Sequence, residues 1–202
     1  MRLPMLRTFL RINEIVMNTP ASHAVRNTLA LAIVQLAAAG MLVACASGPM
    51  SDGPRAVAKL MPTRGNTAAG TATFVQQGGK VLVTADITGL KPNSEHGFHV
   101  HERGDCSSGD GESAGGHFNP FGKPHAAVAT TERHVGDILS LKADSTGRAV
   151  YKAETELMTV TVGAASIVGK GLIVHLNPDD YKTQPTGNAG ARIACAVIER
   201  SR

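Results

Sequence analysis

Tryptophan is missing from this 202-residue sequence, which contains only two tyrosines and five phenylalanines. Proteins that bind nucleic acids combine basic patches with aromatic side chains on which the bases stack, and no such interleaving occurs here. The basic excess is also local. Four of the 20 Lys and Arg residues and one of the 16 Asp and Glu residues lie in residues 1–45, so the remaining chain holds 16 and 15. A nucleic-acid partner is therefore not expected.

A hydrophobic run long enough to span a membrane is also missing. The apolar run Leu29–Ala44 covers 16 residues, which is short for a spanning helix and suits the apolar core of a signal peptide. The run ends in Leu42-Val43-Ala44-Cys45, which resembles the lipobox of bacterial lipoproteins and implies lipidation of Cys45. An ordinary cleaved signal peptide that contains a cysteine by chance is the alternative. Residues 1–45 are therefore predicted to be a signal peptide, and a start at Met17 would make residues 1–16 an extension.

Cysteine is scarce, with three residues in the chain. If Cys45 carries the lipid, Cys106 and Cys195 remain in an exported protein, and an oxidising compartment favours a disulfide between them. The bridge would close a segment of 89 residues. The loop-entropy estimate of its contribution to stability is about 4–5 kcal/mol. Two unrelated buried thiols are the alternative interpretation.

Glycine is plentiful, with 22 residues, and no segment has a convincing helical pattern. Residues 46–55 are small, polar and rich in Pro and Gly, which is typical of a flexible tether. Short β-rich segments separated by turn signals follow, and they predict an all-β sandwich or barrel. The expected strands are Ala56–Leu60, Thr71–Gln76, Lys80–Ile87, His96–His101, Asp137–Ala143, Arg148–Ala153, Thr159–Val162, Leu172–Leu176 and Ile193–Ile198.

Two long polar segments, Gly104–Arg133 and Asn177–Ala191, interrupt this pattern. Loops of this length are unusual in a compact domain unless they are functional or disordered. The first contains His117, His125 and a cysteine, and disorder would not explain that clustering. Both segments are therefore interpreted as functional loops.

Histidines are concentrated at three places in the chain. In the stretch GFHVHE, His99 and His101 are two residues apart, so on a strand both side chains face the same way. His96 would face the other way and is expected to be structural. His134 and Asp137 are three residues apart, and His175 ends an apolar run.

A metal site is the prediction that accounts for this concentration. Seven histidines remain once the leader is removed. Each alone is more often a surface or hydrogen-bonded residue, but together they offer the imidazole ligands that copper and zinc prefer. Apart from His96, the candidates are His99, His101, His117, His125, His134 and His175, with Asp137.

The segments GFHVHERGDCS, GGHFNP, ERHVGD, LIVH and TGNAGARIAC resemble the copper/zinc superoxide dismutase family. The resemblance covers about residues 55–199, in the order of the family's motifs. It implies a Greek-key antiparallel β-sandwich or flattened barrel of about eight strands, with two long functional loops, over residues 56–202. It also implies one copper and one zinc per subunit. The copper ligands implied are His99, His101, His117 and His175, and the zinc ligands implied are His117, His125, His134 and Asp137, with His117 bridging the metals.

The resemblance also implies roles for residues outside the ligand set. Asp179 would link a copper histidine to a zinc histidine, although it could also be a solvated loop acid. Arg192 would hold the anionic substrate beside copper, with Thr186 on the same rim and Lys182 adding positive charge. A guanidinium suits this task because it is permanently charged and offers several donors.

The function implied is dismutation of superoxide to dioxygen and hydrogen peroxide, as antioxidant defence in the cell envelope. Superoxide would be the small anionic substrate. The protein would lie in the periplasm, and the lipid on Cys45 would be its only contact with a membrane. The subunit would be a monomer or part of a homodimer. Two alternatives are a lipoprotein that stores or delivers copper, which has no need of Arg192, and a structural envelope lipoprotein, which has no use for Asp137 and six histidines.

Overall fold

A computed structural model describes residues 53–201 of the chain. The predicted signal peptide, Cys45 with its predicted lipid, and most of the predicted tether lie outside the described residues. Among the described residues, no helix has the length and apolar character needed to cross a membrane.

Residues 53–201 form nine β-strands and a single 3₁₀ turn, as the all-β prediction expects. The elements are β1 (Arg55–Pro62), β2 (Ala69–Gln77), β3 (Lys80–Thr88), β4 (Glu95–His96), β5 (Phe98–His101), the 3₁₀ turn η1 (Glu112–Ala114), β6 (Leu141–Lys142), β7 (Ala149–Thr155), β8 (Gly171–His175) and β9 (Arg192–Ser201).

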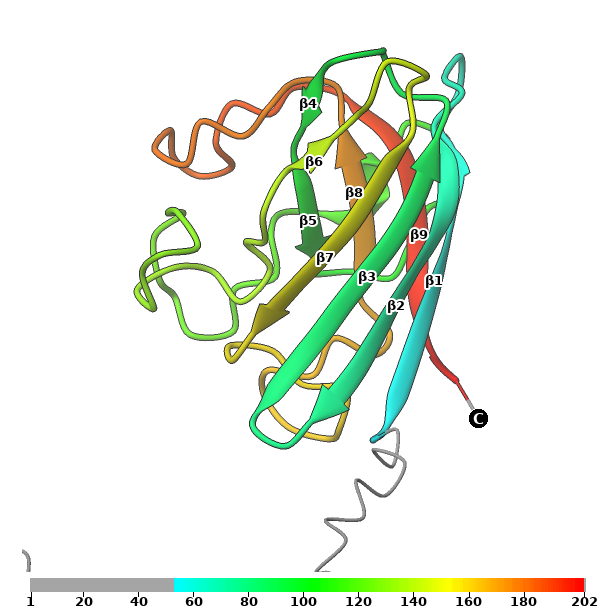
Figure 1. Ribbon diagram of the computed structural model, residues 1–202. Coiled ribbons are helices and arrows are strands. Elements are labelled where there is room, and N and C mark those ends of the chain that lie inside the picture. Colours follow the sequence, from blue (N-terminus) through cyan, green and yellow to red (C-terminus); the bar gives the residue numbers. More distant parts are fainter. Residues whose placement is uncertain (1–52, 202) are drawn as a thin grey trace, which may run out of the picture. The chain divides into compact units, whose positions relative to one another are not determined.

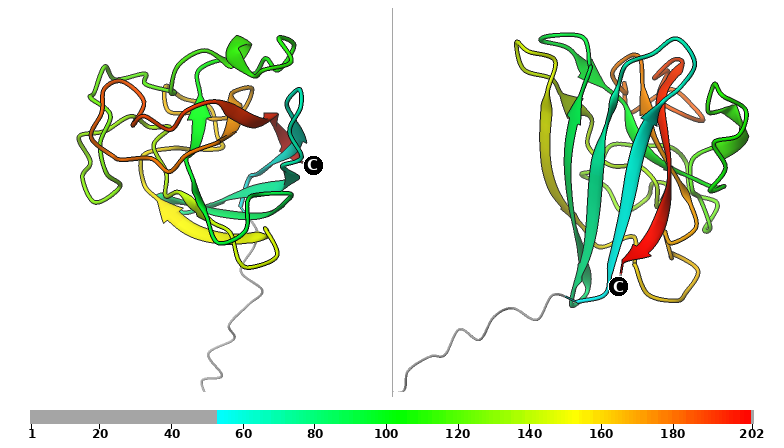
Figure 2. Two further views of the ribbon diagram at one scale, coloured as in Figure 1. Left: turned by 90° about the horizontal axis from the view of Figure 1, so that it is seen from above. Right: turned by 90° about the vertical axis from the view of Figure 1, so that its right-hand side faces the viewer.

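Seven of the strands form one curled antiparallel sheet in the order β5-β8-β9-β1-β2-β3-β7, and β4 pairs with β6 separately (Figure 1). The pairing of β9 with β1, and of β8 with β5, joins strands that are far apart in the chain. This arrangement confirms the predicted Greek-key antiparallel sandwich. The views in Figure 2 show how the sheet curls around its interior.

The strands of the sheet differ in how they are buried. In β1, the buried residues Ala56, Ala58 and Leu60 alternate with more exposed ones, and β3 alternates in the same way. A strand with one solvated face shows this pattern. Every residue of β5 and of β8 is buried, so other parts of the chain cover their second face.

The covering segments are the two predicted loops. The second loop and the later part of the first lie near β4, β5 and β6 (Figure 1), whereas the part of the first loop with Cys106 and η1 lies beside β9 (Figure 2). Gln184 joins them, because its side chain accepts a hydrogen bond from the His125 amide (2.8 Å) and donates one to the His125 carbonyl (2.6 Å). The loops thus pack on the sheet and on each other.

The predicted disulfide is present between Cys106 and Cys195, with a Cα–Cα distance of 5.9 Å. Cys195 lies in β9, three residues after Arg192, and Cys106 lies in the first loop. The bridge therefore attaches the loop to the strand that carries Arg192.

Three of the strand predictions were wrong in extent or type. Within Asp137–Ala143 only β6 is a strand, and His96–His101 is divided at Gly97 into β4 and β5. The segment Thr159–Val162 forms bends with one isolated bridge to Ser166. Gln76 explains the last case, because its Oε1 accepts hydrogen bonds from the amide of Val160 (3.1 Å) and the hydroxyl of Thr159 (2.7 Å). The Gln76 side chain thus accepts the hydrogen bond from the Val160 amide that a carbonyl of a neighbouring strand would accept in a sheet.

The burial of the core predicts that two side-chain truncations differ in their effect on the free energy of unfolding. Phe74 in β2 is fully buried, whereas Val162 is 89% exposed. We expect Phe74→Ala to lower the free energy of unfolding by about 3–5 kcal/mol, because it removes buried apolar surface and leaves a cavity. The control Val162→Ala should change it by less than about 0.5 kcal/mol. Urea unfolding of equally metallated proteins measures both, and a cost below about 1 kcal/mol for Phe74→Ala would contradict this account of the core.

Candidate metal centre

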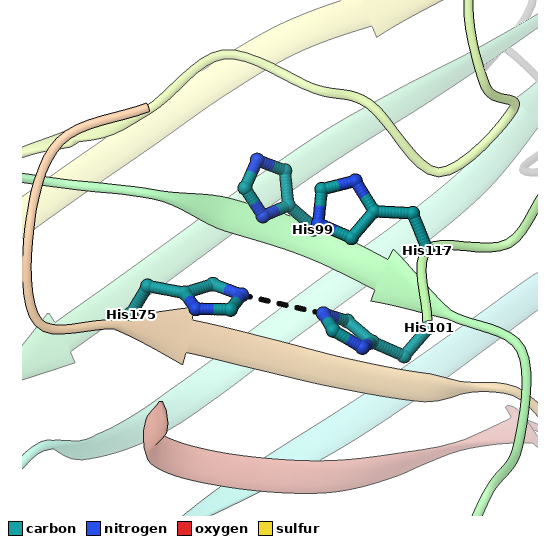
Figure 3. A group of neighbouring side chains, drawn as sticks. All are labelled: His99, His101, His117 and His175. Atoms are coloured by element: carbon teal, nitrogen blue, oxygen red, sulfur yellow. Dashed lines mark hydrogen bonds between the residues drawn. The ribbon is translucent and has the colours of Figure 1, made fainter. Parts of the chain in front are cut away.

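Strands β5 and β8 form the floor of the centre. His99 in β5 is in register with Ile173 of β8, and a register shift occurs between Val174 and His175. Bulges of this kind turn a side chain away from the regular direction of the strand. His175 thus reaches the same space as the β5 histidines (Figure 3).

The first loop and the residues just after it, including Gly136 and Asp137, pair with the outer edge of β5. The Val100 amide donates to the Gly136 carbonyl (3.0 Å), and the Phe118 amide donates to the Val100 carbonyl (2.8 Å). These bonds place His117 opposite His101 and Asp137 opposite His99 in isolated bridges. Backbone hydrogen bonds therefore bring His117 and Asp137 next to the two histidines of β5.

Four histidines meet above this floor in what we call the four-histidine group: His99, His101, His117 and His175. Their ligand atoms lie within 4.8 Å of one another, and all four residues are buried. Figure 3 shows rings from β5, β8 and the first loop gathered together, and the Nε2 atoms of His101 and His175 face each other at 3.3 Å. His99 Nδ1 and His117 Nε2 are buried without a hydrogen-bond partner.

The outer nitrogens of this group are bound to fixed acceptors. His101 Nδ1 donates to the Gly115 carbonyl (2.9 Å), and His175 Nδ1 donates to the Gly190 carbonyl (3.0 Å). His99 Nε2 donates to Asp179 Oδ2 (2.7 Å). Each bond sets the orientation of its ring and leaves the other nitrogen directed inward.

A second group, the Asp137 group, consists of His117, His125, His134 and Asp137, again buried and with ligand atoms within 4.8 Å. Asp137 Oδ1 lies 2.8 Å from His117 Nδ1, 3.0 Å from His125 Nδ1 and 3.2 Å from His134 Nδ1. Despite this distance, His125 Nδ1 forms no hydrogen bond with Asp137, so it is buried without a partner. Three nitrogens and one oxygen converging in this way are the donor set of a closed zinc site.

Asp179 joins the two groups. Its Oδ2 accepts from His99, and its Oδ1 accepts from His125 Nε2 (2.9 Å). Gly187 makes this possible, because a Cβ there would lie 1.9 Å from Asp179 Oδ1, and its φ of +66° favours glycine.

Burial sets the protonation of most of these histidines. It lowers the pKa of His101 and of His175 well below the usual range, and neighbouring histidines add to the effect. Burial and the neighbouring His99 lower the pKa of His117 to about 3, against the hydrogen bond to Asp137. These three imidazoles are thus neutral near pH 7, which is the form that binds a metal.

The acid groups act on His125 in the opposite direction. Burial disfavours its charged form, but the adjacent Asp137 carboxylate and the hydrogen bond to Asp179 outweigh burial and raise its pKa to about 9. Burial would raise the pKa of Asp137, but the three imidazoles that surround its Oδ1, two of them hydrogen-bonded to it, hold it far below the usual range.

Arg192 lies beside the four-histidine group. Its Nη1 donates to the Gly111 carbonyl and its Nη2 to the Gly115 carbonyl, both at 2.7 Å. Gly115 is also the acceptor for His101, so a single carbonyl joins the guanidinium to that histidine. The Arg192 side chain is 11% exposed.

The remaining predicted residues lie farther out. His96 is buried and structural, as expected, with hydrogen bonds to Ser94 Oγ (2.7 Å) and the His175 carbonyl (2.8 Å). Lys182 is exposed and Thr186 is half-buried. Within residues 53–201, no hydrogen bond or ion pair joins either side chain to Arg192.

Comparison with known proteins identifies the family. The family described as copper/zinc superoxide dismutase (SODC) matches residues 68–198. The chain belongs to the copper/zinc superoxide dismutase family. It is a copper/zinc oxidoreductase whose reaction converts superoxide to dioxygen and hydrogen peroxide.

Relatives in distant organisms support the same assignment. The chain is 38% identical over 156 residues to "Superoxide dismutase [Cu-Zn] 2" of Aquifex aeolicus, covering 75% of this chain and 91% of that protein. It is 46% identical over 153 residues to a Yarrowia lipolytica copper/zinc superoxide dismutase, covering 71% and 96%. The crystal structure of the clock protein EA4 is similar, with a TM-score of 0.67, 39% identity and coverage of 75% and 98%.

The donor sets fit the metals of this copper/zinc family. The four-histidine group supplies imidazoles alone, which copper accepts, and the unpartnered His99 and His117 nitrogens point where an ion would lie. The Asp137 group supplies three imidazoles and a carboxylate, which suits zinc. His117 belongs to both groups, with Nδ1 facing Asp137 and Nε2 facing the other histidines.

Sequence reasoning missed some residues that hold the centre together. The carbonyls of Gly115 and Gly190 orient ligands, and Gln184 fixes the backbone of His125. Glu112 forms an ion pair with Arg192. Carbonyl acceptors have no sequence signal, and a single Gln or Glu in a polar loop has a weak one.

The raised pKa of His125 predicts proton release on zinc binding. Since the pKa is about 9, His125 carries a proton at about pH 7.5 in the metal-free protein, and zinc can bind only the deprotonated ring. Zinc uptake at about pH 7.5 should release about one proton, and uptake at about pH 10 should release none from this group. Calorimetry in buffers of different ionisation enthalpy measures the number. Equal proton release at both pH values would contradict the assignment.

The position of Asp179 predicts that both metals depend on it. Asp179→Asn leaves one acceptor oxygen for two imidazole N–H groups and places an amide N–H against the other ring. We expect copper and zinc affinities to fall about 10–100-fold. Asp180→Asn is the matched control, because the Asp180 carboxylate is exposed and, among the described residues, accepts hydrogen bonds from Lys182 and Thr183 alone. Competition with chelators of graded strength measures both, and unchanged affinity in Asp179→Asn would show that the bridge is dispensable.

Proposed function

We propose that Arg192 and the four-histidine group together form the place where superoxide reacts. The observation that carries this proposal is the Gly115 carbonyl, which accepts from Arg192 Nη2 at 2.7 Å and from His101 Nδ1 at 2.9 Å. A fixed positive charge thus lies beside the proposed copper ligands. An anion that approaches them meets that charge.

The reaction takes two superoxide ions and two protons to one dioxygen and one hydrogen peroxide. Copper, when bound, supplies a one-electron acceptor and donor by alternating between Cu(II) and Cu(I). Arg192 attracts and orients each anion. Its charge does not depend on pH over the working range, because a guanidinium stays protonated.

His117 is proposed to serve both metals and to carry a proton. Its Nδ1 faces Asp137 (2.8 Å), and its Nε2 is buried without a partner. With zinc holding Nδ1, Nε2 is the atom that would accept a proton and return it to the reduced oxygen species.

Export and lipid attachment belong to the same proposal. The apolar run Leu29–Ala44 and the following Cys45 support a periplasmic protein tethered to a membrane by one lipidated cysteine. Mass spectrometry of the mature protein tests the lipid on Cys45. Light scattering of the purified domain distinguishes a monomer from a homodimer.

A lipoprotein that stores or delivers copper is the second candidate. It would use the same histidines but would gain nothing from a guanidinium beside them. The two candidates therefore differ in what Arg192 contributes.

Dismutation by residues 46–202, loaded with copper and zinc, is the deciding measurement. We expect fast dismutation with about one copper and one zinc per chain, and a fall of about tenfold or more in Arg192→Ala, because attraction of the anion is lost. Arg200→Ala, an exposed site on the same strand, removes an equal charge and should have little effect. Full metal content without activity would leave copper handling as the better account.

A further inference from the structure

Arg192 has an acidic neighbour that the ligand motifs do not include. The Glu112 carboxylate, in η1, lies 3.2 Å from Arg192 Nη2. The Glu112 side chain is 63% exposed, whereas that of Arg192 is 11% exposed. Among residues 53–201, Glu112 is the one carboxylate within ion-pair distance of this guanidinium. Glu112 is thus a solvent-exposed partner of a guanidinium that is itself largely buried.

Arg192 does not need Glu112 to stay in position. The carbonyls of Gly111 and Gly115 both hold the guanidinium at 2.7 Å. The loop also packs closely on the side chain, because a Cβ at Gly111 would lie 3.2 Å from the Arg192 Cβ, and the φ of +80° at Gly111 favours glycine. Removing the carboxylate should therefore leave the guanidinium where it is.

The backbone holds Glu112 in place as well. Its amide donates to Asp110 Oδ1 (3.0 Å), and its carbonyl accepts from the Gly115 amide (3.1 Å). The disulfide at Cys106 ties the same loop to β9. The carboxylate is thus presented to Arg192 from an ordered turn.

We propose that Glu112 is a built-in competitor for the anion site, which lowers the rate at which Arg192 captures superoxide. The inference rests on the proposed role of Arg192 in holding the substrate. A carboxylate at the guanidinium cancels part of its field and occupies one of its donors. An arriving anion must displace or share that donor.

The charge-removing variant Glu112→Gln tests the proposal, with Glu199→Gln as its matched control. Glu199 is exposed on the same strand as Arg192, seven residues and so roughly 23 Å away. At low ionic strength, we expect Glu112→Gln to raise the second-order rate constant about two- to fivefold. Glu199→Gln should match the wild type, and Glu112→Asp should lie closer to the wild type than Glu112→Gln does.

Salt and a second anion provide readouts that a merely structural role would not move. At about 1 M salt, where the screening length is about 3 Å, the rates of Glu112→Gln and wild type should converge. Azide, titrated against the copper-loaded protein by absorption, should bind about two- to fivefold tighter in Glu112→Gln. An unchanged or lower rate with unchanged azide affinity would overturn the proposal.

The double variant Arg192→Ala with Glu112→Gln separates the two proposals. If Glu112 acts through Arg192, its removal should have no effect when Arg192 is absent. A persisting rate gain would mean that Glu112 acts as a general negative charge, and it would overturn competition for the anion site. Full activity of Arg192→Ala alone would instead show that the proposed role of Arg192 is wrong, whatever Glu112 does.

Discussion

Three imidazoles of the four-histidine group are held in place by a hydrogen bond from one ring nitrogen to an acceptor outside the group. The other ring nitrogen of each is then free to bind a metal. His101 and His175 donate to backbone carbonyls, and His99 donates to Asp179. A buried ring without such a bond could rotate and would leave a donor unsatisfied. The geometry of both candidate metal sites therefore depends on acceptors outside the two groups of candidate ligands, and the Asp179 carboxylate joins the two groups.

The fold supplies these acceptors by covering two strands on both faces. All of β5 and β8 is buried, and the segments that cover them carry His117, His125 and Asp179. The packing of the loops on β5 and β8 thus also brings the residues of the candidate metal centre together. Metal binding should stabilise the loops, because a ligand that binds only the folded state adds its binding free energy to stability.

The proposed anion site is built from the same loop that carries the disulfide. Arg192 is held by two carbonyls of that loop, and one of these also orients His101. The residue proposed to capture superoxide and a proposed copper ligand are therefore held by the same carbonyl, that of Gly115. Glu112 places a negative charge at the same point, so in this proposal the attraction of an anion depends on the balance between one guanidinium and one carboxylate.

The sequence by itself determined the all-β class, the alternating strands of the open part of the sheet and the chemical types of the ligands. Residues two apart on a strand share a face, and motif spacing along one loop limits what its histidines can reach. It mistook Thr159–Val162 for a strand, because the competing acceptor, Gln76, is more than 80 residues away. Only the tertiary structure decided which carbonyls orient the rings, that Gln184 binds the backbone of His125, and that Glu112 meets Arg192. These contacts join residues distant in the chain, and local patterns carry no information about such pairs.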